Sequence, residues 1–150
     1  MSLKVENTIV IKASIAKVWD ALVNPEKTKQ YMFGCKVISS WKVGDPLVWE
    51  MIHEGKEFIP VSGYVLAIDP MHLLSYSVID PNADMEIIPK NHLRVTYQLS
   101  EQNNQTTLTV TQDGFENAAD GQKRYEDVYN NGDGWNPILV MIKKLVEEDL

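Results

Sequence analysis

The segment WNPILVMIKKLV, residues 135–146, decides the fold because it defines a helix with a wide apolar face. Proline is tolerated only in the first turn of a helix, so Pro137 places the helix start near Asp133 or Gly134. A helix with such a stripe must bury it against another apolar surface. The residues at helical spacing on this stripe are Trp135, Ile138, Leu139, Ile142, Leu145 and Val146.

The middle of the chain, upstream of this helix, reads as a series of strands separated by turn residues. The separators are short and rich in Gly, Asn, Asp and Pro. Short connections join antiparallel neighbours, because parallel strands need long crossovers. The region 80–91 contains two prolines and is expected to be a loop that connects two strands. The predicted strands are Cys35–Ser40, Leu47–His53, Glu57–Asp69, Leu73–Val78, Leu93–Glu101 and Thr106–Gly114.

The N-terminal part predicts one more strand and two short helices. Residues 5–12 are rich in β-branched side chains and form the strand. Ser14 is a helix N-cap residue, and Asn24-Pro25-Glu26 starts a second helix that is expected to run to about Phe33 and to stop at Gly34. A further short helix is expected over 118–130.

This order of elements predicts an α+β fold. A curved antiparallel sheet of about six to seven strands wraps around a long C-terminal helix, and two short helices follow the first strand. This is the helix-grip arrangement, and residues 1–150 are expected to form one domain.

Short motifs spread along the chain resemble those of one superfamily. The chain is similar to the START-like (SRPBCC) superfamily, and within it to the family of homologues of the activator of the heat-shock protein 90 ATPase. The resemblance implies the helix-grip fold with a hydrophobic cavity between the concave face of the sheet and the terminal helix. The motifs are IVIKAS (9–14), VWDALVNPE (18–26), YMFG (31–34), WKVGD (41–45), GYV (63–65), IDP (68–70), LSY (74–76), TLTVTQDGF (107–115) and GW (134–135).

Strand alternation predicts which side chains line that cavity, because alternate residues of a strand share a face. The same side chains could instead make a filled core. Tyr76, Tyr97 and Gln112 favour a ligand site, because buried polar groups need partners and small-molecule pockets combine an apolar lining with a few polar groups. The predicted lining is Tyr31, Met32, Phe33, Trp49, Met51, Tyr76, Val78, Val95, Tyr97, Leu108, Val110, Gln112, Trp135, Leu139 and Ile142.

Composition limits the partners. The formal net charge is -7, and no basic patch is present that would attract a nucleic acid. No apolar stretch reaches the ~20 residues that span a bilayer. The single cysteine, Cys35, forms no internal disulfide, and the N-terminal residues do not resemble a secretory signal. We therefore expect a cytoplasmic protein, either a monomer or a weak homodimer.

Catalytic and metal-binding motifs are absent from the sequence. The histidines His53, His72 and His92 do not have the spacing of metal ligands, although His53 could act as a base at the cavity mouth. Asp80, Asp84 and Glu86 lack the pattern of a calcium loop and read as a solvated loop. No catalytic residue, metal or cofactor is predicted.

Three functions remain open on these grounds. The first is a binding module for a small hydrophobic or aromatic molecule. The second is a chaperone-associated stress-response domain, which the family name implies. The third is a cyclase- or dehydratase-like enzyme acting on a polyketide-type substrate, as some START-like proteins do, with Tyr76, Tyr97, Gln112 and His53 as candidate groups.

Overall fold

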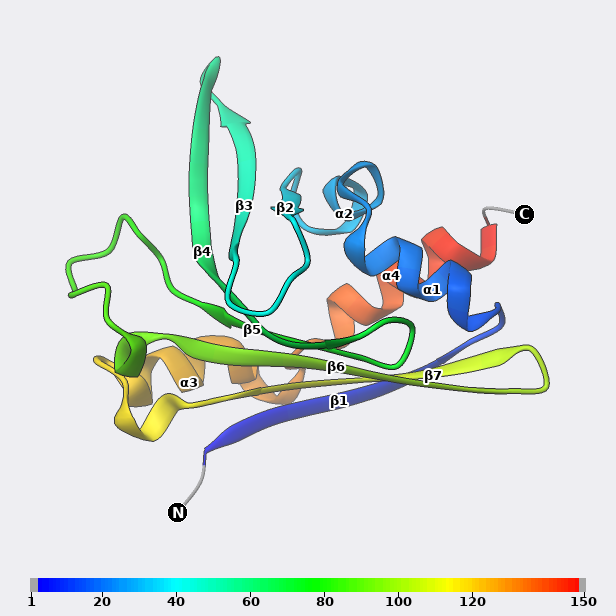
Figure 1. The fold of residues 1–150 in the computed structure, drawn as a ribbon. Helices are drawn as coiled ribbons and strands as arrows, with labels where there is room; N and C mark the ends of the chain where they lie inside the picture. The colour runs from blue at the N-terminus through cyan, green and yellow to red at the C-terminus, as the bar shows by residue number, and fades with distance from the viewer. Residues whose placement is uncertain (1–2, 149–150) are drawn as a thin grey trace.

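The computed structural model describes residues 3–148 as one curved sheet with helices packed against it (Figure 1). Three short 3-10 helices, η1 (Pro89–Asn91), η2 (Phe115–Asn117) and η3 (Asn130–Gly132), lie in the connections. The other elements, in chain order, are β1 (Lys4–Ile11), α1 (Ile15–Val23), α2 (Pro25–Tyr31), β2 (Lys36–Ser39), β3 (Pro46–His53), β4 (Lys56–Asp69), β5 (Leu73–Val78), β6 (Leu93–Gln102), β7 (Gln105–Asp113), α3 (Gly121–Tyr129) and α4 (Asn136–Glu148).

The sheet has seven strands in the order β1-β7-β6-β5-β4-β3-β2, and every neighbouring pair is antiparallel. All the connections from β2 to β7 therefore join adjacent strands, and only the long link through α1 and α2 separates β1 from β2. The β3–β4 hairpin stands up from the strands β5, β6, β7 and β1, which gives the sheet its pronounced bend (Figure 1). The predicted α+β fold with a curved antiparallel sheet is confirmed.

Strand β4 produces much of this bend because it carries two irregularities. Its pairing with β3 shifts between Trp49/Val61 and Met51/Phe58, and its pairing with β5 shifts between Val65 and Ala67. Each shift leaves an extra residue on β4, as β-bulges do. The bulge beside Pro60 means that simple alternation along β4 does not identify its inward face.

Close approach of β4 and β5 explains the glycine at position 63. A Cβ atom added to Gly63 would lie 1.7 Å from the carbonyl oxygen of Ser77. The Ser77 hydroxyl also accepts a hydrogen bond from the backbone N–H of Tyr64, at 3.0 Å. Only glycine allows these two neighbouring strands to approach each other this closely.

Helices α1 and α2 begin at the predicted caps. The Ser14 hydroxyl accepts from the Lys17 amide, and the Asn24 side-chain oxygen accepts from the Glu26 amide. Helix α2 ends at Tyr31 rather than at the predicted Phe33, because Phe33 adopts a positive φ of 55°. The apolar residues Met32 and Phe33 thus lie in the turn after the helix.

Helix α4 begins at Asn136, later than the predicted Asp133 or Gly134. Gly134 has a φ of 52° and its amide bonds back to the carbonyl of Tyr129, so residues 130–134 form a turn after α3. Pro137 occupies the first turn of the helix, as expected. Helix α3 is likewise shorter than the predicted 118–130, because residues 115–117 form η2 and the chain turns again before Gly121.

The core lies between α4 and the sheet. Leu139, Ile142 and Val146 of α4 are buried in the same cluster as Leu108 and Val110 of β7. None of the helices among residues 3–148 has the length and hydropathy that crossing a bilayer requires.

Candidate functional site

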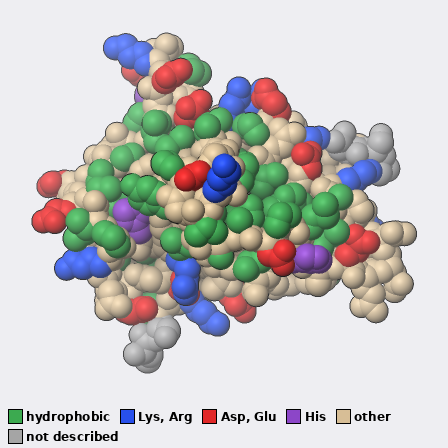
Figure 2. Space-filling view, in the orientation of Figure 1, with side chains coloured by type: hydrophobic (Ala, Val, Ile, Leu, Met, Phe, Trp, Pro, Cys, Tyr) green, Lys and Arg blue, Asp and Glu red, His purple; other side chains and the backbone are tan. Residues whose placement is uncertain are grey.

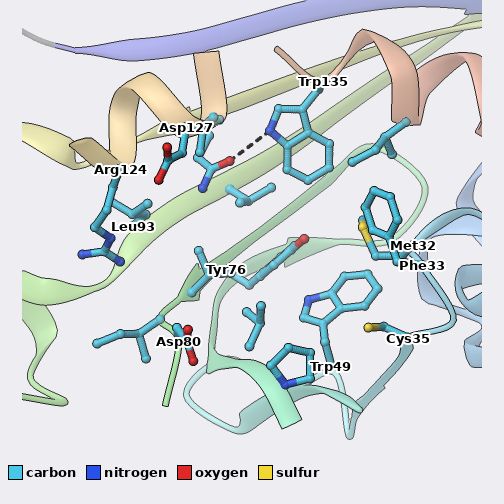
Figure 3. Close-up of a pocket in the computed structure, with 18 of the residues that line it drawn as sticks. Met32, Phe33, Cys35, Trp49, Tyr76, Asp80, Leu93, Arg124, Asp127 and Trp135 are labelled. Carbon is cyan, nitrogen blue, oxygen red and sulfur yellow. Dashed lines mark hydrogen bonds between the residues drawn. The ribbon is translucent and has the colours of Figure 1, made fainter. Parts of the chain in front are cut away.

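A cavity of about 570 Å³ opens beside the start of α4, between the bent sheet and α3. The β3–β4 hairpin forms one wall, β5 and β6 form the floor, and α3 with the start of α4 forms the opposite wall. The turn after α2 closes one end (Figure 3). The volume lies within the range of small-molecule pockets, which is roughly 300–1,000 Å³.

The predicted lining residues divide into two groups. Those of the first group line the cavity, and they come from the α2 turn, β3, β5, β6, β7 and the residue before α4. They are Met32, Phe33, Trp49, Met51, Tyr76, Val78, Val95, Gln112 and Trp135.

The second group lies in the packed core and not on the cavity wall. Beyond the first turn of α4, its inward side chains are buried in one cluster with those of the sheet, and they do not border the cavity. This group consists of Tyr31, Tyr97, Leu108, Val110, Leu139 and Ile142, which are all nearly inaccessible.

Sequence reasoning did not select several residues that line the cavity. Leu93 has the parity of Val95 and Ile138 lies on the α4 stripe, so both could have been found by the same patterns. The contributions of α3 depend on how that helix is placed in three dimensions. The additional lining residues are Cys35, Pro60, Val61, Ile79, Asp80, Leu93, Arg124, Asp127, Val128, Asn130, Gly134 and Ile138.

One row of side chains crosses the floor of the cavity. Tyr76 of β5 pairs with Val95 of β6, which pairs with Gln112 of β7. Adjacent strands lie about 4.8 Å apart, so the two polar ends of this row are roughly 10 Å from each other at the backbone. The register of the sheet therefore places a phenol and a carboxamide on either side of an apolar residue.

The Tyr76 hydroxyl is hydrogen-bonded to the Tyr97 hydroxyl, with 2.8 Å between the two oxygens. Both rings are buried and pack at a centroid distance of 5.7 Å. Burial raises the pKa of Tyr76 well above its ordinary value, and the neighbouring Tyr97 raises it further. Burial also raises the pKa of Tyr97. Both phenols are thus protonated at neutral pH and serve as hydrogen-bond donors.

Gln112 is fixed by the indole of Trp135. The Trp135 Nε1–H donates to Gln112 Oε1 at 2.9 Å, and the Trp135 backbone N–H donates to Asn7 Oδ1, also at 2.9 Å. The close contact of Gly134 with this asparagine leaves no room for a larger residue. The turn before α4 is therefore anchored to β1 and orients the indole over the cavity (Figure 3).

The charged residues of the lining lie on one side of the cavity. Arg124 Nη1 donates to the carbonyl oxygens of Asn91 and Ala119, at 2.7 and 3.2 Å. Burial lowers the pKa of Arg124, while Asp120 and Asp80 act in the opposite direction. Figure 3 shows Arg124, Asp127 and Asp80 on one side of the cavity, away from Trp135 and Met32.

Cys35 lines the far end of the cavity, and its thiol has a pKa raised by burial. A raised pKa keeps the thiol neutral and weakly nucleophilic. The position of this thiol makes it a single-site reporter of what enters the cavity.

None of the histidines borders the cavity. His53 is exposed at the tip of the β3–β4 hairpin and packs against Phe58, so it is not at the mouth. His92 bonds through Nδ1 to the carbonyl oxygen of Ile88. Residues 3–148 hold no group of three or more His, Cys, Asp or Glu side chains arranged as metal ligands. The cavity lining therefore contains no imidazole, and its carboxylates are those of Asp80 and Asp127.

These features place the chain in a known class. The bent antiparallel sheet with a C-terminal helix on its concave side is the helix-grip fold of START-like proteins. The chain belongs to the family described as activator of Hsp90 ATPase homolog 1-like protein, whose profile matches residues 12–147.

Solved structures agree with this assignment. The solution structure of ChR145 from Cytophaga hutchinsonii is 36% identical, aligns over 97% of this chain and 94% of that one, and gives a TM-score of 0.73. Protein NE0264 from Nitrosomonas europaea is 17% identical over 98% and 96% of the chains, with a TM-score of 0.73. CalU16 from Micromonospora echinospora is 17% identical over 97% and 76%, with a TM-score of 0.68. No curated protein matches the chain.

Proposed function

We propose that this protein binds a small hydrophobic or aromatic molecule in the cavity between its sheet, α3 and the start of α4. The observation that carries the proposal is the cavity itself, which is large enough for such a molecule and lined mainly by apolar and aromatic side chains. Burying apolar surface contributes roughly 25 cal/mol per Å², so an apolar ligand of ordinary size gains affinity from this lining. Met32 and the aromatic rings of Trp49 and Trp135 supply much of it.

The experiment compares ligands extracted from three purified proteins: wild type, Val78→Phe and Val140→Phe. Val78 borders the cavity, so phenylalanine there reduces its volume. Val140 is 57% exposed on the outer side of α4 and provides the same substitution without touching the cavity. Organic extracts are analysed by mass spectrometry.

A compound enriched with wild type and Val140→Phe and depleted with Val78→Phe supports the proposal. Equal recovery from all three proteins contradicts it, because the compound would then be held elsewhere or carried over from the cell.

A second candidate function is association with a chaperone, and a surface feature favours it. Exposed apolar side chains gather on the outside of the sheet, where Tyr64 and Leu66 of β4 lie near Val43 and Ile87 from adjacent loops. Figure 2 shows hydrophobic side chains gathered across the middle of the face toward the viewer. Exposed apolar patches of this kind mark interaction surfaces.

The test adds the protein to an Hsp90 ATPase assay. Stimulation that Leu66→Lys removes supports this function, and an unchanged ATPase rate contradicts it.

A further inference from the structure

The inner wall of the cavity carries hydrogen-bond donors that no protein atom uses. Gln112 provides the first. Its Oε1 accepts from the Trp135 indole, and because the indole N–H can only donate, the amide nitrogen must point the other way. Nothing among residues 3–148 accepts from that nitrogen.

The Gln112 amide nitrogen must therefore face the cavity. The described part of the chain contains no fully buried side-chain nitrogen or oxygen without a partner. The nitrogen is consequently accessible, yet Gln112 is only 7% exposed and lines the cavity. The accessible surface of this amide is on the cavity side.

The tyrosine pair provides the second donor. Two hydroxyl groups carry two protons, and one of them lies between the oxygens of Tyr76 and Tyr97. Both side chains are nearly inaccessible from outside the protein, but Tyr76 lies on the cavity wall and Tyr97 does not. If Tyr76 donated to Tyr97, the Tyr97 proton would be left buried without an acceptor, which costs free energy. The favoured arrangement has Tyr97 donating to Tyr76, and the Tyr76 proton is then free to enter the cavity.

The charged side chains of the lining lie at one end of the cavity. They are Asp80, Arg124 and Asp127, and Figure 3 shows them on the side opposite Met32, Phe33 and Cys35. A charged ligand group buried at the opposite end would have no counter-ion, and burying an unpaired charge is costly. The inner end thus accepts a neutral group only.

We infer that the cavity selects neutral, largely apolar molecules bearing a carbonyl-type oxygen, which accepts a hydrogen bond from the Tyr76 hydroxyl. The Gln112 amide, on the same row of the sheet, is available to a second acceptor oxygen. This inference rests on the proposed function, because it concerns the ligand of the same cavity. It makes Tyr76 a specificity-determining residue.

The experiment uses two flat aromatic probes of nearly equal size, fluorene and 9-fluorenone, which differ by one carbonyl oxygen. Each is titrated into the 15N-labelled protein, and NMR follows the Trp135 indole N–H and the Gln112 amide. A net hydrogen bond corresponds to about a threefold to tenfold difference in affinity, so fluorenone is expected to bind that much more tightly.

Two variants separate hydrogen bonding from packing. Tyr76→Phe removes the donor, and the preference for fluorenone is expected to disappear while fluorene still binds. Tyr97→Phe removes a hydroxyl of the same pair but leaves Tyr76 able to donate, so the preference is expected to remain. Loss of preference in both variants alike would overturn the inference, because a general change in packing would explain it.

The outcomes also distinguish this inference from the proposed function. Equal affinity of wild type for the two probes overturns the inference and leaves the proposed function standing. Failure of both probes to shift the Trp135 and Gln112 signals overturns both.

Discussion

The hydroxyl groups of Tyr76 and Tyr97 show how a single hydrogen bond defines the character of a site. Buried phenols keep their protons because a phenolate in an apolar environment lacks solvation. The pair is thus a fixed source of hydrogen-bond donation rather than an acid–base couple.

The raised pKa values of the buried tyrosines predict a loss of stability at alkaline pH. In the unfolded chain these phenols have the ordinary tyrosine pKa of about 10, whereas in the folded protein burial raises the pKa and they remain protonated to higher pH. The folded state is therefore expected to lose stability as the pH rises above the pKa that the phenols have in the unfolded chain. Urea midpoints measured from pH 8 to 11 test this, and Tyr97→Phe should show a shallower decline. An equally steep decline in that variant would contradict the assignment.

Gly63 of β4 is predicted to tolerate no side chain. Gly63→Ala forces the new methyl group onto the Ser77 carbonyl oxygen, so β4 and β5 must separate. The expected loss is about 2 kcal/mol of unfolding free energy, as for overpacked sites. Chemical denaturation provides the measurement, with Ser62→Ala as the control on the same strand. A Gly63→Ala protein as stable as the control would show that the strands do not approach this closely.

Among the elements, α4 is held at both ends by contacts with β1 and the residue after it. Its start is tied through Trp135 and Asn7, and near its end Glu147 Oε2 accepts from the Lys12 backbone N–H at 2.7 Å. That bond is the largest cause of the lowered pKa of Glu147, and Lys143 adds to it. The two attachments hold the helix across the concave face of the sheet.

Glu147→Gln tests the second attachment. A carboxyl group whose folded pKa is lowered stabilises the protein above its unfolded pKa and loses that effect as the pH falls through the folded value. The variant is expected to be less stable at pH 7 by under about 1 kcal/mol, because the site is partly screened by solvent. The difference should shrink by pH 3. Thermal unfolding at both pH values measures it, and a constant difference would contradict the role of the charge.

The elements also show what the sequence could and could not predict. Regular alternation in β5, β6 and β7 predicted which side chains share the concave face, and these three strands pair with one another without a shift in register. Alternation did not distinguish cavity-lining residues from core residues beneath α4. Side chains in a packed core and side chains on a cavity wall have the same apolar pattern in the sequence. The mouth was missed because Arg124 and Asp127 come from α3, whose position no local pattern specifies.

On the scale of the whole molecule, the bend in β4 and the late start of α4 create the cavity together. The β3–β4 hairpin bends away from the rest of the sheet. The anchored turn at Gly134 keeps α4 from filling the space between this hairpin and α3. The family resemblance predicted such a cavity without placing it along the sheet. Its position near the start of α4 emerges only from the folded arrangement.

Cys35 offers a test of access to this cavity. Its thiol is the only one in the chain, lies on the cavity wall and has a pKa raised by burial. Alkylation by iodoacetamide is expected to be slow at neutral pH and slower still when fluorene is present. Mass spectrometry counts the single label. A rate unaffected by fluorene would place the probe outside the cavity.

The most direct test of the central claim is a fluorescence titration with N-phenyl-1-naphthylamine, a neutral apolar probe that brightens in apolar surroundings. The account predicts saturable binding of one probe per wild-type chain, retained in Val140→Phe and weakened in Val78→Phe. Wild type that fails to bind the probe saturably, or a Val78→Phe protein that binds it as tightly as wild type, would contradict the claim that this cavity is a binding site.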